Sequence, residues 1–208
     1  MKNKVILEKE NKIDLLSESL QKAFTYSEYR SLVETNATNG TSTGPNQSEA
    51  LSNYTLLNHS RMKRLDKTIK ISEEVQEKFR NFTGDHTWLV ITESWCGDAA
   101  HSMPAMNALA NIAPGIDFKV VLRDENPILI NAFQFNGTLS IPRLIALNNT
   151  SQEIVDVWGP RPSIATQMVE EFKTEFGALT SQFKQDLQLW YNKDKMANII
   201  ADLANLID

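Results

Sequence analysis

The chain has 208 residues, 41% of them hydrophobic, and a formal net charge of −5 at pH 7. This length can bury one hydrophobic core with some additional elements, and the acidic balance argues against a basic surface for nucleic acid or anionic lipid. The single cysteine, Cys96, excludes any intramolecular disulfide. The three histidines are too scattered for a set of ligands, so we expect no metal site.

The first twelve residues mix Lys and Glu with a few apolar residues. A secretory signal needs an apolar run of about 7–15 residues after a basic start, and a membrane-spanning helix needs about 18 apolar residues. The sequence contains neither pattern. We therefore expect a cytoplasmic protein that does not associate with a membrane.

The first 80 residues follow a helical pattern that one polar segment interrupts. Apolar residues recur near a 3.6-residue period on both sides of this segment, and Ser72 is a typical N-cap. The expected elements are a helix over 13–34, a polar loop over 35–48, a helix over 49–66, a short strand over 68–71 and a helix from Ser72 to Phe82. We interpret residues 1–80 as an N-terminal helical extension.

From residue 87 the apolar pattern changes from helical to extended, and the two patterns then alternate. Short runs of strand-forming residues are bounded by polar residues, and helical stretches separate them. Pro104 falls inside one of these helices and should kink it. The expected elements are strands over 88–92, 118–122, 144–147 and 154–158, and helices over 99–111 and 127–135. This order predicts an α/β fold, in which helices flank a mixed sheet on both faces.

Three further helical stretches close the chain, over 163–176, 179–191 and 195–207. The first two carry a stripe of aromatic residues at helical spacing. Such a stripe is more typical of helix packing than of a groove for a partner. It comprises Phe172, Phe176, Phe183 and Trp190.

Four sequence features stand in a fixed order between about residues 88 and 176. Trp95-Cys96-Gly97-Asp98-Ala99 follows a buried strand and opens a helix that contains Pro104. Asp124-Glu125-Asn126 follows the second strand, and Ile141-Pro142 precedes the last hairpin. In this order the features resemble the thioredoxin family, which has W-C-G-P-C, a helix-kinking proline, an Asp-x-Asn segment and a cis-proline dipeptide.

The resemblance extends to a bacterial branch of thioredoxin-like proteins that carries W-C-G-D-A. Residues 136–142 (NGTLSIP) and 159–162 (GPRP) are similar to the downstream segments of that branch. The resemblance implies that residues 81–208 form a thioredoxin-like domain with extra C-terminal helices, and that the N-terminal extension is an addition to it.

Three residues depart from the thioredoxin pattern. Ala99 stands where the family has its resolving cysteine, and Asp98 replaces the proline between the two cysteines. Val90 replaces a buried carboxylate that accepts a proton in thioredoxins. Each replacement removes one part of ordinary dithiol chemistry.

Cys96 is the candidate catalytic residue, because a thiolate is the reactive form of cysteine and a helix N-terminus favours an anion. The carboxylates of Glu93 and Asp98 would oppose ionisation if they faced the sulfur. Arg161, in the loop after the last strand, is the candidate for a compensating cation. Gly97 completes the motif and is a candidate supporting residue of the site.

The sequence leaves two functions open. In the first, the protein is a monothiol thiol–disulfide oxidoreductase, in which Trp95, Ile141 and Pro142 shape the substrate groove beside Cys96. An external low-molecular-weight thiol such as glutathione would then release the product, because no second cysteine can do so. This function predicts that the pKa of Cys96 lies below about 7.5. In the second, the same groove binds a protein partner without turnover.

The expected partner is therefore a protein or a small thiol or disulfide, and we expect no cofactor apart from that external thiol. The N-terminal extension could cover the groove or form a homodimer contact. His101 lies five residues after Cys96, off its helix face, so we expect it to be solvated. We assign no functional role to Arg123.

Overall fold

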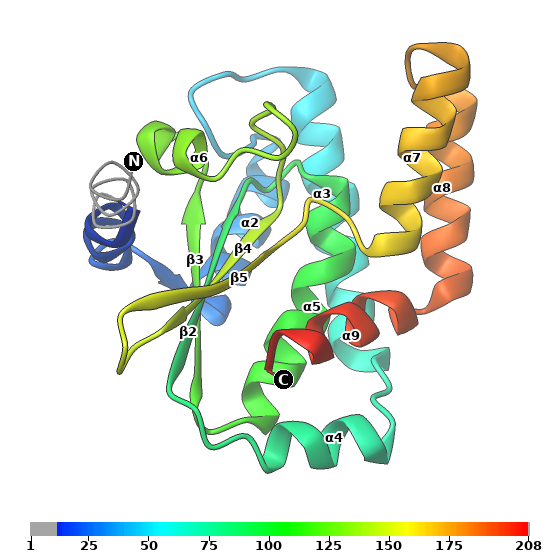
Figure 1. Ribbon diagram of the computed structural model, residues 1–208. Helices are drawn as coiled ribbons and strands as arrows, with labels where there is room; N and C mark the ends of the chain where they lie inside the picture. The colour runs from blue at the N-terminus through cyan, green and yellow to red at the C-terminus, as the bar shows by residue number, and fades with distance from the viewer. Residues whose placement is uncertain (1–11, 208) are drawn as a thin grey trace.

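The computed structural model describes residues 12–207. Its centre is a five-stranded sheet in the order β1-β3-β2-β4-β5 (Figure 1). The strands are β1 (Phe24–Thr25), β2 (His86–Thr92), β3 (Ile116–Leu122), β4 (Arg143–Asn148) and β5 (Glu153–Trp158). Strands β2 and β3 are parallel, and each of the other neighbouring pairs is antiparallel. The predicted mixed sheet is therefore confirmed.

Strand β2 lies at the centre of the hydrophobic core, and all seven of its residues are buried. Val90 of this strand is in register with Val120 of β3 on one side and with Leu144 of β4 on the other. A strand covered on both faces has a continuous apolar sequence, as this one does. Strand β2 thus provides a rigid support for the loop that carries Cys96.

Helices cover both faces of the sheet. Figure 1 shows α6 on one side and α3, α5 and α9 on the other. The helices are α2 (Tyr26–Asn39), α3 (Glu49–Thr68), α4 (Glu73–Arg80), α5 (Gly97–Ile112), α6 (Pro127–Ala132), α7 (Ser163–Phe176), α8 (Ser181–Asp194) and α9 (Ala197–Ala204), followed by a 3₁₀ turn (Asn205–Ile207). Residues 12–20, before β1, are also helical. The predicted α/β class with added N-terminal and C-terminal helices is confirmed.

The helix predicted over 13–34 is wrong in its middle. Residues 12–20 are helical, but Phe24 and Thr25 then form β1, which pairs with the edge of β3. Thr25 caps the next helix, α2: its hydroxyl accepts a hydrogen bond from the N–H of Glu28, and its own N–H donates to the Glu28 carboxylate at 2.7 Å. This capping box is a sequence signal for a helix start. The apolar period, which runs through it, concealed the signal.

Two further boundaries differ from the sequence prediction. Helix α2 continues to Asn39 and ends at Gly40, whose φ of 67° is the left-handed conformation that glycine adopts readily at a helix end. The polar loop is therefore shorter than predicted. The strand expected over 68–71 is absent from the described sheet, because α3 runs through Thr68. Ser72 does cap α4, accepting a hydrogen bond from the N–H of Val75 at 3.4 Å.

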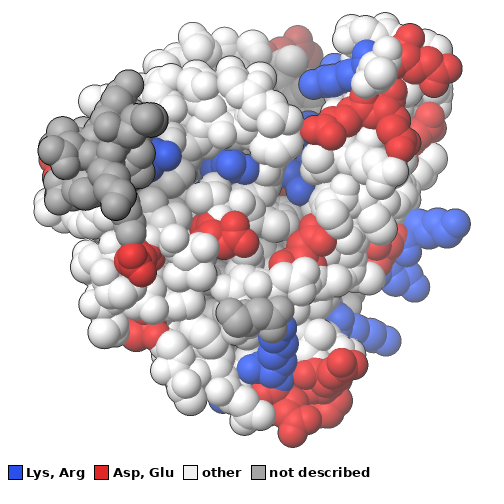
Figure 2. All heavy atoms as spheres, viewed as in Figure 1, with Lys and Arg blue, Asp and Glu red and all other residues white. Residues whose placement is uncertain are grey.

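The C-terminal helices form a layer beside α5. Helices α7 and α8 lie side by side (Figure 1), and the ring centroids of Phe172 and Phe183 are 4.2 Å apart. The interpretation of the aromatic stripe as helix packing is confirmed for these two residues. Helix α9 buries Ile199 and Leu203 completely. Acidic side chains gather over α7 and α4 on the face in Figure 2.

Candidate functional site

Cys96 is the N-cap residue of α5, directly after the loop that leaves β2. Its side chain is buried, with the residue only 7% exposed, and its thiol donates a hydrogen bond to the carbonyl oxygen of Ile141 at 3.3 Å. The peptide bond between Ile141 and Pro142 is cis, as the resemblance implied. The structure therefore brings the lone sulfur and the cis-proline dipeptide together, although 45 residues separate them.

The surroundings of Cys96 favour the neutral thiol. Burial raises the pKa of Cys96 to about 12, and the negative charge of Asp98 adds to this rise. The backbone N–H groups of Ala99 and Asp98 and the charge of Arg161 lower the pKa, but they do not compensate for the burial. The monothiol function predicts a pKa below about 7.5. The structure shifts the pKa in the opposite direction.

Asp98 uses both carboxylate oxygens in contacts with distant elements. A terminal nitrogen of Arg161 lies 2.8 Å from Oδ2, and the hydroxyl of Tyr191 donates a hydrogen bond to Oδ1 at 3.0 Å. Burial raises the pKa of Asp98, and the two partners oppose that rise. Arg161, the candidate for a compensating cation, pairs directly with Asp98, and its charge also lowers the pKa of Cys96. The aspartate thus joins the start of α5 to the loop after β5 and to α8.

Glu93 is fully buried but does not face the sulfur. One carboxylate oxygen accepts a hydrogen bond from the N–H of Asp124 at 2.9 Å, and the other accepts one from the hydroxyl of Thr43. Burial raises the pKa of Glu93, and these two bonds lower it. The condition under which Glu93 would oppose ionisation of Cys96 is therefore not met, because its carboxylate binds Thr43 and Asp124 instead. Its role is to connect the polar loop and the end of β3 to the site.

Residues from the first 80 positions support the loop between β2 and α5. The N–H of Ser94 donates to the hydroxyl oxygen of Thr43 at 2.8 Å, and the N–H of Thr43 donates to that of Ser94 at 3.0 Å. Asn58 of α3 donates to the carbonyl oxygen of Ser94 at 2.9 Å, and the hydroxyl of Thr55 lies 2.8 Å from the Ser94 hydroxyl. This network was not predictable from the sequence. The polar residues that form the network have the sequence pattern of a loop and of an exposed helix surface.

Trp95 forms one wall of the site. The guanidinium carbon of Arg123 lies 4.8 Å from the centre of the Trp95 ring, and Arg123 also pairs with Asp124 at 2.8 Å. Stacking of a guanidinium on an aromatic face restricts both side chains. Arg123, to which the sequence assigned no role, therefore positions Trp95.

His101 is buried, not solvated as expected. Its Nε2 atom lies 3.1 Å from the side-chain oxygen of Gln188, and its ring stacks on that of Tyr191 with centroids 4.3 Å apart. Burial lowers the pKa of His101 to about 3, so the ring is neutral at pH 7. Helix α8 covers this face of α5, and the spacing from Cys96 alone could not show that contact.

An open cavity of about 490 Å³ surrounds the sulfur. Of the residues singled out in the sequence, Trp95, Cys96, Gly97, Asp98, Ile141 and Arg161 line it. Glu93 and Pro142 are not part of the lining. The site thus has one neutral thiol, an aromatic wall and the backbone of Ile141 beside the cis-proline.

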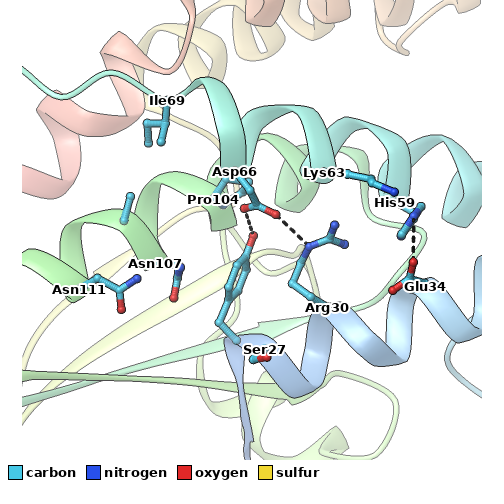
Figure 3. Close-up of a pocket in the computed structure, with 12 residues that line it drawn as sticks. Ser27, Arg30, Glu34, His59, Lys63, Asp66, Ile69, Pro104, Asn107 and Asn111 are labelled. Carbon is cyan, nitrogen blue, oxygen red and sulfur yellow. Dashed lines mark hydrogen bonds and ion pairs between the residues drawn. The ribbon is translucent and has the colours of Figure 1, made fainter.

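A different cavity, of about 530 Å³, lies between α2, α3 and α5 (Figure 3). Three of its lining side chains contact a carboxylate, whereas Lys63 forms no ion pair among residues 12–207. The hydroxyl of Tyr26 donates to Asp66 at 2.6 Å, Arg30 contacts the other oxygen of Asp66 at 3.1 Å, and His59 lies 3.9 Å from Glu34. These pairs brace α2 against α3, and the cavity contains no residue of the site around Cys96.

A cysteine that begins a helix at the end of the central strand, opposite a cis-proline, defines a protein of the thioredoxin-fold class. The family model for thioredoxin matches residues 44–173. This span is more than half of the chain, so the chain belongs to the thioredoxin family.

Two solved structures share the fold. One is a protein of unknown function from Pseudomonas aeruginosa, with 15% identity and a TM-score of 0.56 over 73% of this chain and 84% of that one. The other is an HIV epitope scaffold, with 14% identity and a TM-score of 0.55 over 88% of this chain and 98% of that one. Similarity at this level shows the fold alone. No curated protein matches the chain.

Two physical properties of residues 12–207 complete the description. None of the helices in this part of the chain is both long and apolar enough to cross a membrane. Nor do its His, Cys, Asp and Glu side chains gather in any group of three or more that could hold a metal ion.

Proposed function

We propose that the protein is a thioredoxin-fold binding module, whose groove beside Cys96 holds an extended peptide segment without disulfide exchange. The observation that carries this proposal is the state of the sulfur. The thiol is buried and donates its proton to the Ile141 carbonyl, and burial raises its pKa to about 12. Less than one thiol in a thousand is then ionised at pH 7, roughly, which leaves little nucleophile.

No group at the site is placed to remove the thiol proton. Asp98 is the nearest carboxylate, but Arg161 and Tyr191 occupy both of its oxygens. The only other buried carboxylate of the loop, Glu93, accepts its hydrogen bonds from Thr43 and Asp124. A nucleophilic cysteine needs a lowered pKa or an adjacent base. The described site supplies neither.

The backbone beside the cis-proline supports peptide binding. The N–H of Ile141 has no hydrogen-bond partner among residues 12–207, and this residue lines the cavity. An unpaired N–H at the edge of a groove can donate a hydrogen bond to the backbone of an extended peptide. Main-chain hydrogen bonds of this kind supply affinity when a peptide binds as an added strand. Trp95, positioned by Arg123, gives that peptide an aromatic surface to pack against.

Selection from a library of short, C-terminally amidated peptides tests the proposal. Cys96→Ser keeps a donor for the Ile141 carbonyl, so we expect it to select the same peptides as the wild-type protein. Trp95→Ala should weaken their binding by about tenfold, as loss of a central aromatic contact does. Phe176→Ala, a change at an exposed aromatic residue on α7, is the matched control and should bind normally. Loss of every selected peptide with Cys96→Ser would refute binding without exchange.

One observation favours the monothiol oxidoreductase as a second candidate. The sulfur lines the cavity and receives hydrogen bonds from the backbone N–H groups of Ala99 and Asp98, which stabilise a thiolate. In that function the Cys96 thiolate attacks a disulfide, forms a mixed disulfide and expels one thiolate. A low-molecular-weight thiolate then attacks the mixed disulfide, forms a new disulfide and restores Cys96. A pH titration of iodoacetamide alkylation separates the candidates, since a pKa below about 7.5 requires the second.

A further inference from the structure

Three cationic side chains from separate parts of the chain converge beside the groove. Arg61 comes from α3, Arg161 from the loop after β5, and Lys184 from α8. They line a cavity of about 450 Å³ between α3 and α8. This cavity adjoins the cavity around Cys96, and five residues line both: Tyr54, Gly97, Asp98, Arg161 and Lys184. Such a cluster is notable in a chain whose net charge is −5.

Arg61 has no carboxylate partner among the described residues. It is half-buried, and its guanidinium donates one hydrogen bond, to the side-chain oxygen of Asn58 at 2.8 Å. Burial lowers the pKa of Arg61 and the charge of Arg64 lowers it further, whereas the nearby charge of Asp98 raises it. A cation removed from water without a carboxylate in direct contact is destabilising. An anion bound in this cavity would relieve that destabilisation.

The other two cations also have donors to spare. Arg161 contacts Asp98 through one terminal nitrogen, while its Nε atom is buried without a hydrogen-bond partner among residues 12–207. The ammonium group of Lys184 forms no ion pair in that part of the chain, and the residue is exposed. Asp98 is the single carboxylate in the cavity lining, and Arg161 and Tyr191 already occupy it. The cavity lining therefore carries more cationic side chains than carboxylates.

The rest of the lining combines apolar side chains with the polar residues Ser181, Gln185 and Gln188. Tyr54 and Leu57 of α3 are 52% and 58% exposed, and Leu179 and Leu187 contribute from the region of α8. Exposed apolar side chains rimmed by charge are typical of a binding surface. The combination fits an anionic group at the cations with apolar groups beside it.

We propose that this cavity binds an aspartate or glutamate side chain of the peptide in the groove, so that the protein selects acidic segments. The inference rests on the proposed function and names its ligand class. Because Gly97, Arg161 and Lys184 line both cavities, the acidic residue lies within a few positions of the peptide residue above Cys96. In the cavity at α2, by contrast, the guanidinium of Arg30 already contacts Asp66.

The test is the same selection, scored for Asp and Glu against their amides Asn and Gln at every position of the peptide. A charge-assisted hydrogen bond to a half-buried guanidinium is stronger than one to a neutral group, so acidic peptides should bind the wild-type protein at least tenfold more tightly than their amides. C-terminal amidation removes the terminal carboxylate as a source of the effect. Arg61→Gln keeps a partner for Asn58 and should abolish the preference.

Two further variants keep the result interpretable. Lys184→Gln changes an exposed residue, so folding is not at risk, and it should reduce the acidic preference about twofold to fivefold. Lys67→Gln, at the exposed last turn of α3 and outside the cavity, should leave the preference unchanged. Equal binding of acidic peptides and their amides to the wild-type protein, with Trp95→Ala still weakening both, would overturn the inference and leave the proposed function intact. If no peptide of either kind binds, the proposed function fails and the inference with it.

Discussion

Replacement of Asp98 by asparagine tests the central electrostatic feature of the site. Asparagine can accept a hydrogen bond from Arg161 through its oxygen and donate one to the hydroxyl of Tyr191, so the contacts are kept while the charge is lost. Arg161, whose side chain is 23% exposed, is then left without its counter-ion. Breaking a fully buried ion pair costs about 3–5 kcal/mol, and solvent access reduces this to about 1–2 kcal/mol here.

The same substitution should make Cys96 more acidic. The negative charge of Asp98 is the second-largest cause of the raised pKa of Cys96, after burial. Without that charge the pKa of the thiol should fall, while burial keeps it above that of free cysteine. Each unit of decrease multiplies the thiolate fraction about tenfold at neutral pH. Asp98→Asn is therefore expected to be less stable and more reactive at the same time.

Two measurements check this pair of effects. Urea unfolding gives the change in the free energy of unfolding, and iodoacetamide alkylation across a range of pH gives the pKa of Cys96. Ile199→Val, a buried change in α9 that costs about 1 kcal/mol, controls for reactivity that arises only from lower stability. Alkylation of Asp98→Asn with the wild-type pH profile, or no loss of stability, would refute the reasoning.

Three further outcomes follow from buried polar groups. The pKa of His101 is lowered to about 3, so as pH drops its ring binds a proton in the unfolded chain first. The free energy of unfolding should therefore fall below about pH 6.5, by about 2–4 kcal/mol near pH 4. In urea unfolding, His101→Phe should reduce this loss of stability at acidic pH. The pKa of Glu93 is raised, so as pH drops its carboxylate binds a proton in the folded chain first. Ionisation of Glu93 should therefore lower the free energy of unfolding as pH rises above about 4.5. Over that range the stability of the wild-type protein should fall relative to that of Glu93→Gln. Thr43→Val removes hydrogen-bond partners from Glu93 and Ser94 and should cost about 2–3 kcal/mol, whereas Thr38→Val, at an exposed position of α2, should change the thermal midpoint little.

The order of motifs made the fold predictable. A tryptophan and cysteine after a buried strand, with Ile141-Pro142 before a hairpin, fixed the relation between α5 and β4 without knowledge of the packing. Strand β1 was not predictable in the same way. Leu20 and Phe24 continue a helical period, and only the capping box at Thr25 and Glu28 shows that a new helix begins there.

The sequence predicted which residues lie at the candidate site better than it predicted which charged groups pair there. Arg161 does lie beside the site, but which anion it pairs with depends on the position of the Asp98 carboxylate, and α8 helps to hold that carboxylate through Tyr191. His101 shows the same limit, since a helix 87 residues further along the chain supplies its hydrogen-bond partner. Local spacing carries no information about such distant contacts.

The hydroxyl of Thr43 has a practical consequence for dissecting the protein. The stretch that matches the family model begins at residue 44, so a fragment cut at that position would omit Thr43, β1 and α2. Glu93 would lose the hydroxyl that donates to it, and β3 would lose the strand that covers its outer edge. An unprotected edge invites pairing with other chains. A trimmed version of this protein would therefore be expected to self-associate, and measurements on it would describe the aggregate instead of the groove.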